Sequence, residues 1–291
     1  MAAVSANGIT IEYEERGSGP PLLLVMGLGG QLTDWPGGFI DLLASHYRVI
    51  VFDNRDIGLS TEFTAPPATR GQLVKAFVAR RPPPAEYLIS DMAADAAGLL
   101  TALGIEAAHV VGMSMGGMIA QAMAIDHPAK VRSLTSIMSK PGDPRSGGIA
   151  PKLMVRLARR PNATRETAVD DAIALFRVIG GSSYDEAEHR ARQEISLARS
   201  FRPHGQLRQT VAIAASPDRT PGLERLELPT LVVHGLQDPL VVPSGGIATA
   251  KAVRGSRLLM FPDMGHDLPK TRWPEITEAI QAVADRSAVP L

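Results

Sequence analysis

Apolar residues gather in seven short runs along the chain, separated by longer stretches in which polar residues recur. Most of the runs are rich in Val, Leu and Ile and show little alternation between apolar and polar positions. They cover residues 9–13, 22–26, 47–52, 108–113, 133–138, 230–235 and 257–261. Strands that are buried on both faces of a parallel sheet have this composition. The pattern therefore predicts a central, mostly parallel sheet.

Two of the stretches between these runs carry apolar residues at helical spacing. Within residues 86–103 the apolar stripe ends just before Gly104, a residue suited to terminating a helix. Its members are Leu88, Met92, Ala96, Leu99 and Leu103. A second stripe near the end of the chain consists of Trp273, Ile276, Ile280 and Val283. Strands that alternate with helices predict an α/β fold with the sheet flanked by helices on both faces.

Residues 140–215 interrupt this alternation. The segment opens with "KPGDPRSGGIAPK", which is typical of a loop because of its Gly, Pro and Asp content. Two helices are predicted after it, over 164–179 and 184–201, and Ser183 and Glu186 have capping-box spacing at the start of the second. We expect 140–215 to form a helical cap insertion, with 1–139 and 216–291 forming the core.

Composition removes several classes of function. The 291 residues include 30 Lys and Arg and 30 Asp and Glu, so the formal net charge is zero, which argues against nucleic acid or an acidic membrane as a partner. The absence of cysteine excludes disulfides, thiolate metal sites and a Cys nucleophile. Because no secretory signal and no membrane-spanning apolar run is visible, we expect a cytoplasmic protein. The sequence leaves its oligomeric state open.

Candidate chemistry lies in "HVVGMSMGGMIAQAMA", where Ser114 stands between Gly112 and Gly116. A buried strand that turns at once into a helix places the residue at the bend in a strained conformation and exposes its side chain. Glycine is needed on either side because a Cβ there would collide with the neighbouring strand or helix. These features describe a nucleophile elbow. A G-x-S-x-G pattern can also arise by chance in a Gly-rich chain, so a base and an acid are required to support a catalytic serine.

The base that would remove the serine proton is predicted to be His266. It follows the run 257–261 on a Pro- and Gly-rich loop, and therefore lies at the same carboxyl edge of the sheet as Ser114. The other six histidines lie at strand starts, within a strand, at a helix end or in the insertion. They are His46, His109, His127, His189, His204 and His234.

Two aspartates compete to orient this histidine. Asp238, in "HGLQDPLV", directly follows the run 230–235, and the chain order is then serine, aspartate, histidine. Asp143 follows the run 133–138 in the looser "KPGDPRSGG" and is the alternative acid. Asp263 and Asp267 are too close to His266 in sequence to orient it easily, so we expect them to shape the loop.

With these residues in place, the chain resembles the α/β-hydrolase fold superfamily, of the esterase type with a helical cap. The stretches "LLLVMGLGGQLTDW", "VIVFDNRDIGLST" and "HVVGMSMGG" are most similar to aclacinomycin methylesterase-like hydrolases. The resemblance implies an oxyanion hole made by two backbone N–H groups, those of Leu28 and Met115. Many members carry His-Gly at the first position, whereas this chain has Met26 and Gly27. The charged residues of "FDNRDIGLS" are expected to brace loops.

The expected activity is a serine hydrolase that cleaves carboxylic esters of hydrophobic small molecules through an acyl-enzyme, with neither cofactor nor metal. Perhydrolase (haloperoxidase-like) activity and C–C bond hydrolysis use the same three side chains, so the residues do not choose among them. A ligand receptor built on the same fold is the non-enzymatic alternative.

Overall fold

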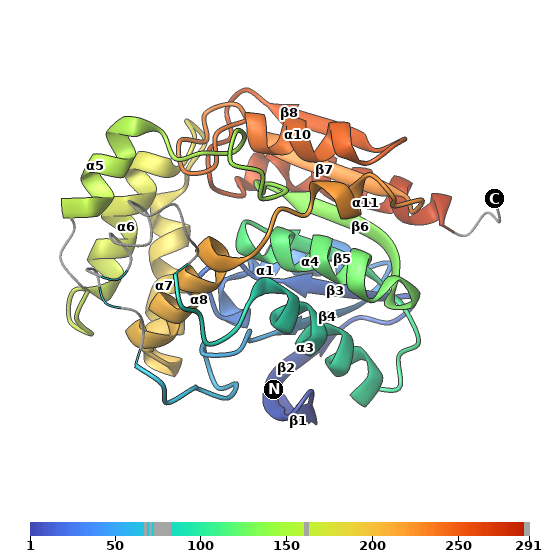
Figure 1. Cartoon of the computed structure of the whole chain (residues 1–291), viewed down its shortest axis with the longest axis horizontal. Helices are drawn as coiled ribbons and strands as arrows, with labels where there is room; N and C mark the ends of the chain where they lie inside the picture. Colours follow the sequence, from blue (N-terminus) through green and yellow to red (C-terminus); the bar gives the residue numbers. More distant parts are fainter. Residues whose placement is uncertain (67–68, 70–71, 73–82, 160–162, 288–291) are drawn as a thin grey trace.

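The computed structural model describes residues 1–66, 69, 72, 83–159 and 163–287. Its centre is an eight-stranded sheet with the order β1-β2-β4-β3-β5-β6-β7-β8 (Figure 1). The strands are β1 (Ala2–Ala6), β2 (Ile9–Arg16), β3 (Pro21–Val25), β4 (Arg48–Phe52), β5 (Ala108–Met113), β6 (Val131–Ile137), β7 (Thr230–Gly235) and β8 (Arg257–Phe261). All seven predicted strands are present, and the sheet from β4 to β8 is parallel.

The antiparallel part of the sheet lies at one edge. β2 runs antiparallel to both of its neighbours, β1 and β4. Val4 of β1 faces Ile11 of β2 in the register of this pair. β1 was not predicted, because its residues, AAVSA, are small and form no apolar run.

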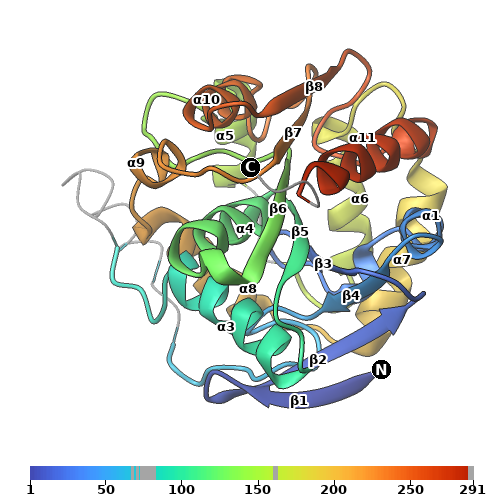
Figure 2. The ribbon, with the colours of Figure 1, turned by 90° about the vertical axis from the view of Figure 1, so that its right-hand side faces the viewer.

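Helices cover both faces of the sheet. Figure 2 shows α3 and α4 on one side and α1 and α11 on the other. The helices of the core are α1 (Gly37–Ala44), α3 (Ile89–Ala102), α4 (Met115–Asp126), α9 (Thr220–Leu223), α10 (Ser244–Ala252) and α11 (Trp273–Arg286). Short 3-10 turns are η1 (Leu32–Asp34), η2 (Pro128–Lys130) and η3 (Lys270–Arg272). The stripe predicted over 86–103 begins its helix at Ile89, after Leu88 as N-cap.

The uninterrupted apolar character of the strands follows from this two-sided cover. In β3, Leu23 and Val25 belong to the apolar core beneath α3 and α4, whereas Leu22 and Leu24 belong to the core beneath α1 and α11. All four side chains are fully buried. Successive residues of a strand point to opposite faces, so a strand with two covered faces must be apolar at every position.

The chain between β6 and β7 contains four further helices, grouped at the left of Figure 1 beyond one end of the strands. They are α5 (Pro151–Arg159), α6 (Ala168–Ile179), α7 (Glu186–Arg199) and α8 (Pro203–Ala215). Residues 160–162 of the expected cap insertion lie outside the described residues, as do 288–291 and parts of 67–82 in the expected core. We refer to 140–215 as the cap segment.

One expectation about the cap segment is wrong. Asp185, not Ser183, is the N-cap of α7, and its side chain accepts a hydrogen bond from the amide of Glu188. The Ser183 hydroxyl instead donates to Oδ2 of Asp263, in the loop after β8. The capping-box spacing was misleading because an aspartate two residues further on is an equally good N-cap.

Across the described residues, no helix combines the length and the apolar character needed to cross a membrane.

Candidate active site

Ser114 occupies the bend between β5 and α4. Its backbone has φ 56° and ψ −119°, a conformation that residues other than glycine rarely adopt. Ser114 is also the N-cap residue of α4. Its own amide donates to the carbonyl of Ile137 at 2.9 Å, which ties the bend to the neighbouring strand β6. A strained, non-glycine residue held by its surroundings is a common feature of functional sites. The bend therefore has the geometry predicted for a nucleophile elbow.

Gly112 and Gly116 allow the backbones of β5, α4 and β3 to approach one another closely, because neither glycine has a side chain. A Cβ on Gly112 would lie 2.0 Å from the carbonyl oxygen of Gly116, and a Cβ on Gly116 would lie 2.0 Å from that of Val25. A Cβ on Gly27 would lie 3.2 Å from the Cβ of Ser114, so the turn after β3 also runs directly beside the serine. The glycines flanking Ser114 are thus required by close backbone approach.

The structure brings Ser114, His266 and Asp238 into one hydrogen-bonded row. Nε2 of His266 lies 2.9 Å from Oγ of Ser114, and Nδ1 lies 2.7 Å from Oδ2 of Asp238. The three residues follow β5, β8 and β7, so the parallel strands deliver them to the same edge of the sheet. His266 and Asp238 are buried, whereas Ser114 is half-buried.

The surroundings of Asp238 favour its charged form. Oδ1 accepts hydrogen bonds from the amides of Leu240 and Val241, both at 2.9 Å. Burial alone would raise the pKa of Asp238. The charge of His266, its hydrogen bond and the amide of Val241 together outweigh burial and hold the pKa of this carboxyl well below its usual range. An ionised carboxylate at this position can orient the imidazole and stabilise its cation.

His234 is a neighbour of the acid that the sequence did not single out. It lies fully buried on β7, with Nε2 2.8 Å from the carbonyl oxygen of Val241 and 3.5 Å from Oδ2 of Asp238. The shorter contact is the hydrogen bond, because a carbonyl can only accept and Nε2 must then donate. The imidazole of His234 therefore links strand β7 by a hydrogen bond to Val241, at the end of the turn that contains Asp238.

Asp143, the alternative acid, is occupied elsewhere. Its carboxylate accepts hydrogen bonds from the amide of Arg145, at 2.8 Å, and from the hydroxyl of Ser146. The hydrogen bond from Ser146 is the main reason why the pKa of Asp143 is lowered. Both donors belong to its own turn. The structure therefore places Asp238, and not Asp143, against His266.

The backbone amides of Met115 and Leu28 make no hydrogen bond within the described residues. Met115 is the first residue of α4, where helical N–H groups have no partner within the helix. In the turn after β3, the amide of Gly29 donates to Oε1 of Gln209 at 2.9 Å and that of Gly30 donates to the carbonyl of Gly27 at 3.2 Å. Among the amides of residues 28–30, that of Leu28 is left without an acceptor in the described part of the chain.

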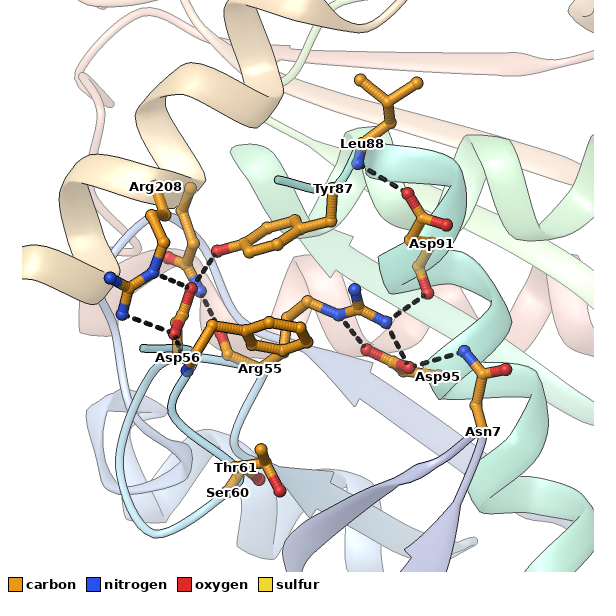
Figure 3. Close-up of polar contacts among 12 residues, drawn as sticks. Asn7, Arg55, Asp56, Ser60, Thr61, Tyr87, Leu88, Asp91, Asp95 and Arg208 are labelled. Atoms are coloured by element: carbon orange, nitrogen blue, oxygen red, sulfur yellow. Dashed lines mark hydrogen bonds and ion pairs between the residues drawn. The ribbon is translucent and has the colours of Figure 1, made fainter. Parts of the chain in front are cut away.

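The charged residues of the loop after β4 brace the structure, as expected. Asp56 accepts two hydrogen bonds from Arg208 of α8, both at 2.8 Å, and one from the Tyr87 hydroxyl at 2.6 Å (Figure 3). The Arg55 guanidinium donates hydrogen bonds to both carboxylate oxygens of Asp95 on α3, as Figure 3 also shows. All of these groups are buried. The loop is thereby fixed to the core on one side and to the cap segment on the other.

Asp53 of the same loop supports the turn after β3. Its carboxylate accepts the amides of Leu32 and Leu59, at 2.8 and 2.9 Å, and lies 2.6 Å from the Arg199 guanidinium of α7. Gly58 has φ 59°, and a Cβ there would overlap the Asp53 carboxylate. In the described residues, no group of three or more His, Asp or Glu side chains is arranged to hold a metal ion.

Comparison with known proteins agrees with this architecture. The family model of the alpha/beta hydrolase fold matches residues 20–271. The chain belongs to that family.

The relatives include a methylesterase and another hydrolase. Rhodomycin D methylesterase DauP of Streptomyces sp. (strain C5) is 27% identical over 284 residues, which covers 90% of each chain. A 2-hydroxymuconate semialdehyde hydrolase of Pseudomonas sp. (strain CF600) is also 27% identical, covering 95% of this chain and 88% of its own. The enol-lactonase of Burkholderia xenovorans LB400 has the same fold, with a TM-score of 0.75 at 22% identity and coverage of 98% and 100%.

Proposed function

We propose that this protein is a serine hydrolase that cleaves carboxylic esters of hydrophobic small molecules. The observation that carries the proposal is the row Ser114–His266–Asp238, with the serine at a strained strand-to-helix bend and both hydrogen bonds within 3 Å. A nucleophile, a base within hydrogen-bond reach and an acid that orients the base together define acyl-transfer chemistry.

In the proposed first step, Oγ of Ser114 attacks the ester carbonyl while Nε2 of His266 takes the serine proton. Asp238 accepts from Nδ1, which leaves Nε2 as the basic nitrogen, and its charge stabilises the imidazolium that forms. The carbonyl oxygen becomes an oxyanion that the amides of Leu28 and Met115 hold by hydrogen bonds. His266 then gives the proton to the departing alcohol, and the acyl group remains on Ser114.

The second step releases the acid. Nε2 of His266 takes a proton from a water molecule while the water oxygen attacks the acyl carbonyl, and the same two amides stabilise the second oxyanion. When this oxyanion collapses, the bond between the acyl carbon and Oγ of Ser114 breaks, His266 returns the proton to Oγ, and the carboxylic acid leaves. Every proton in this cycle passes through one imidazole, so its orientation governs both steps.

The residues around the elbow support an uncharged, apolar substrate. Met26, Met115 and Met118 are buried in the apolar core near the bend, and Met113 is half-buried against it. Methionine supplies apolar, adaptable surface without charge. We therefore expect uncharged esters with short to medium acyl groups. The likeness to the methylesterase DauP supports an ester substrate.

C–C bond hydrolysis is the second candidate, favoured by the likeness to the 2-hydroxymuconate semialdehyde hydrolase. Perhydrolysis would require hydrogen peroxide to replace water in the second step. Both reactions would use Ser114 and His266, so substrate comparison must decide among them.

The test is a set of steady-state assays on the wild type and on Ser114→Ala. p-Nitrophenyl acetate and butyrate report ester hydrolysis, a vinylogous 1,5-diketone reports C–C cleavage, and peracid formation from acetate with hydrogen peroxide reports perhydrolysis. We expect the highest kcat/KM on an ester and its loss in Ser114→Ala. Turnover that survives in Ser114→Ala would refute the serine mechanism, and absence of turnover on all three would favour a receptor.

A further inference from the structure

The loop that carries His266 is packed directly against the cap segment. The amide of His266 donates to the carbonyl of Ile179, the last residue of α6, at 2.7 Å. A Cβ on Gly265 would lie 2.4 Å from that same carbonyl oxygen, and a Cβ on Gly181 would lie 2.1 Å from the carbonyl of Asp263. The two backbones touch because both contact points are glycines. The base is therefore hydrogen-bonded through its own backbone to the cap segment.

Asp267, the residue after the base, joins the two sides of this contact. Its Oδ1 accepts a hydrogen bond from the amide of Gly181 in the cap segment and another from the amide of Gly265 in the histidine loop, both at 2.9 Å. Asp267 is 7% exposed, and burial raises the pKa of its carboxyl. Its other oxygen, Oδ2, is buried without a hydrogen-bond partner in the described residues.

Such a carboxylate is costly for folding, because a buried acceptor that lacks a partner loses its hydration without compensation. The side chain instead fixes the position of the loop. Its Oδ1 holds Gly265, the residue before His266, and also Gly181, in the turn just after the Ile179 carbonyl that accepts the amide of His266. The proton-transferring contact between Nε2 and Oγ of Ser114 is 2.9 Å. A displacement of the loop by a fraction of an ångström would change that contact.

We propose that Asp267 is a positioning residue for His266, which clamps the base-bearing loop to the turn between α6 and α7. The cap segment is then part of the catalytic apparatus as well as a cover. The proposal rests on the proposed function, since it assigns a step to His266. Its consequence is that loss of the clamp lowers kcat more than it raises KM, because both chemical steps depend on the orientation of the imidazole.

The same contact offers a matched control. Asp263 also links the histidine loop to the cap turn, because its Oδ2 accepts from the hydroxyl of Ser183 at 2.8 Å. It also pairs with Arg272, Nη2 of which lies 2.9 Å from Oδ1. Neither contact involves the residue next to the base. Asp263→Ala therefore loosens the same interface without releasing Gly265.

The experiment measures kcat, KM and thermal midpoint for Asp267→Ala, Asp267→Asn and Asp263→Ala with p-nitrophenyl butyrate, together with amide hydrogen exchange over 262–267. Asp267→Ala should lose at least about tenfold in kcat with KM changed less than about threefold. Asp267→Asn keeps an oxygen that accepts both amides and should retain kcat within about threefold, as should Asp263→Ala. Exchange of the Gly265 amide should accelerate in Asp267→Ala but not in Asp263→Ala, in which Asp267 still accepts from that amide. If Asp267→Ala does not fold, Asp267→Ser, whose short hydroxyl cannot span both amides, is measured in its place with the same expected loss.

Three results would overturn the proposal: equal kcat in Asp267→Ala and Asp263→Ala, an equal loss in the Asn and Ala variants, or a change confined to KM. In each of these cases the wild type would still turn over in a Ser114-dependent manner, so the proposed function would stand. Absence of Ser114-dependent turnover in the wild type would refute the proposed function and the role of Asp267 in catalysis together.

Discussion

Nδ1 of His266 lies 2.7 Å from Oδ2 of Asp238 although 27 residues separate them in the chain. The pairing arises because β7 and β8 are parallel neighbours, so the loops that follow them emerge side by side. Asp143, after β6, is bonded within its own turn. Of the two aspartates, the structure thus places against His266 the one that the sequence favours, Asp238.

We expect Asp238→Asn to lower kcat by up to about 10⁴-fold, because an amide permits the imidazole tautomer that blocks proton transfer from Ser114. Asp143→Asn should change kcat by less than about threefold, since its partners lie outside the row. Steady-state kinetics on both folded variants is the measurement. An inactive Asp143→Asn beside an active Asp238→Asn would reverse the assignment of the acid.

Gly116→Ala should destabilise the protein by about 1–3 kcal/mol or more, because the added Cβ would lie 2.0 Å from the backbone oxygen of Val25. Gly37→Ala is the control: a Cβ at this helical position meets nothing within 4 Å and should not lower stability. Urea denaturation gives both values. Equal stability of the two variants would mean that the elbow does not need its glycine.

Arg208→Ala should cost about 3–5 kcal/mol, because it leaves the fully buried Asp56 carboxylate without its guanidinium partner. The exposed pair of Arg190 with Asp170 is the comparison, and Arg190→Ala should change stability by less than about 0.5 kcal/mol. The same denaturation assay applies. A small effect of Arg208→Ala would show that α8 is held to the core by other contacts.

His109 makes stability depend on pH. Burial, with the charge of Arg132, lowers the pKa of His109 from 6.5 to about 4, while Nδ1 stays 2.9 Å from the Ser133 hydroxyl. Between these two pH values the unfolded chain binds the proton that the folded protein does not, so stability falls as the pH falls from about 6.5 towards about 4. His109→Asn removes this contribution. Unfolding free energies measured from pH 7.5 to 4.5 should decline less in the variant; parallel curves would contradict the prediction.

The fold could be predicted largely because buried parallel strands read as uninterrupted apolar runs. Helices whose buried positions are not apolar were missed. In α8 the buried positions include Gly205, Arg208 and Gln209, whose polar groups pair with the loop after β4. In α10, Gly246 is needed because a Cβ there would lie 2.6 Å from the ring of His234. Neither helix carries an apolar stripe.

Strand ends were enough to select Ser114, Asp238 and His266 as candidates, since chemistry at a parallel sheet gathers at its carboxyl edge. The contacts that support them could not be selected in the same way. The hydrogen bond of His234 to Val241 and the two amides held by Asp267 depend on how loops and the cap segment pack. The spacing of residues along the chain does not predict such packing.

Covalent labelling tests most directly whether Ser114 is the nucleophile. The protein is treated with a fluorophosphonate, digested and mapped by peptide mass. We expect a single adduct on Ser114 that forms only at native pH and in the folded protein, no adduct in Ser114→Ala, and a kcat in that variant lower by about 10⁶-fold. An adduct on another serine, or full hydrolysis by Ser114→Ala, would contradict the account.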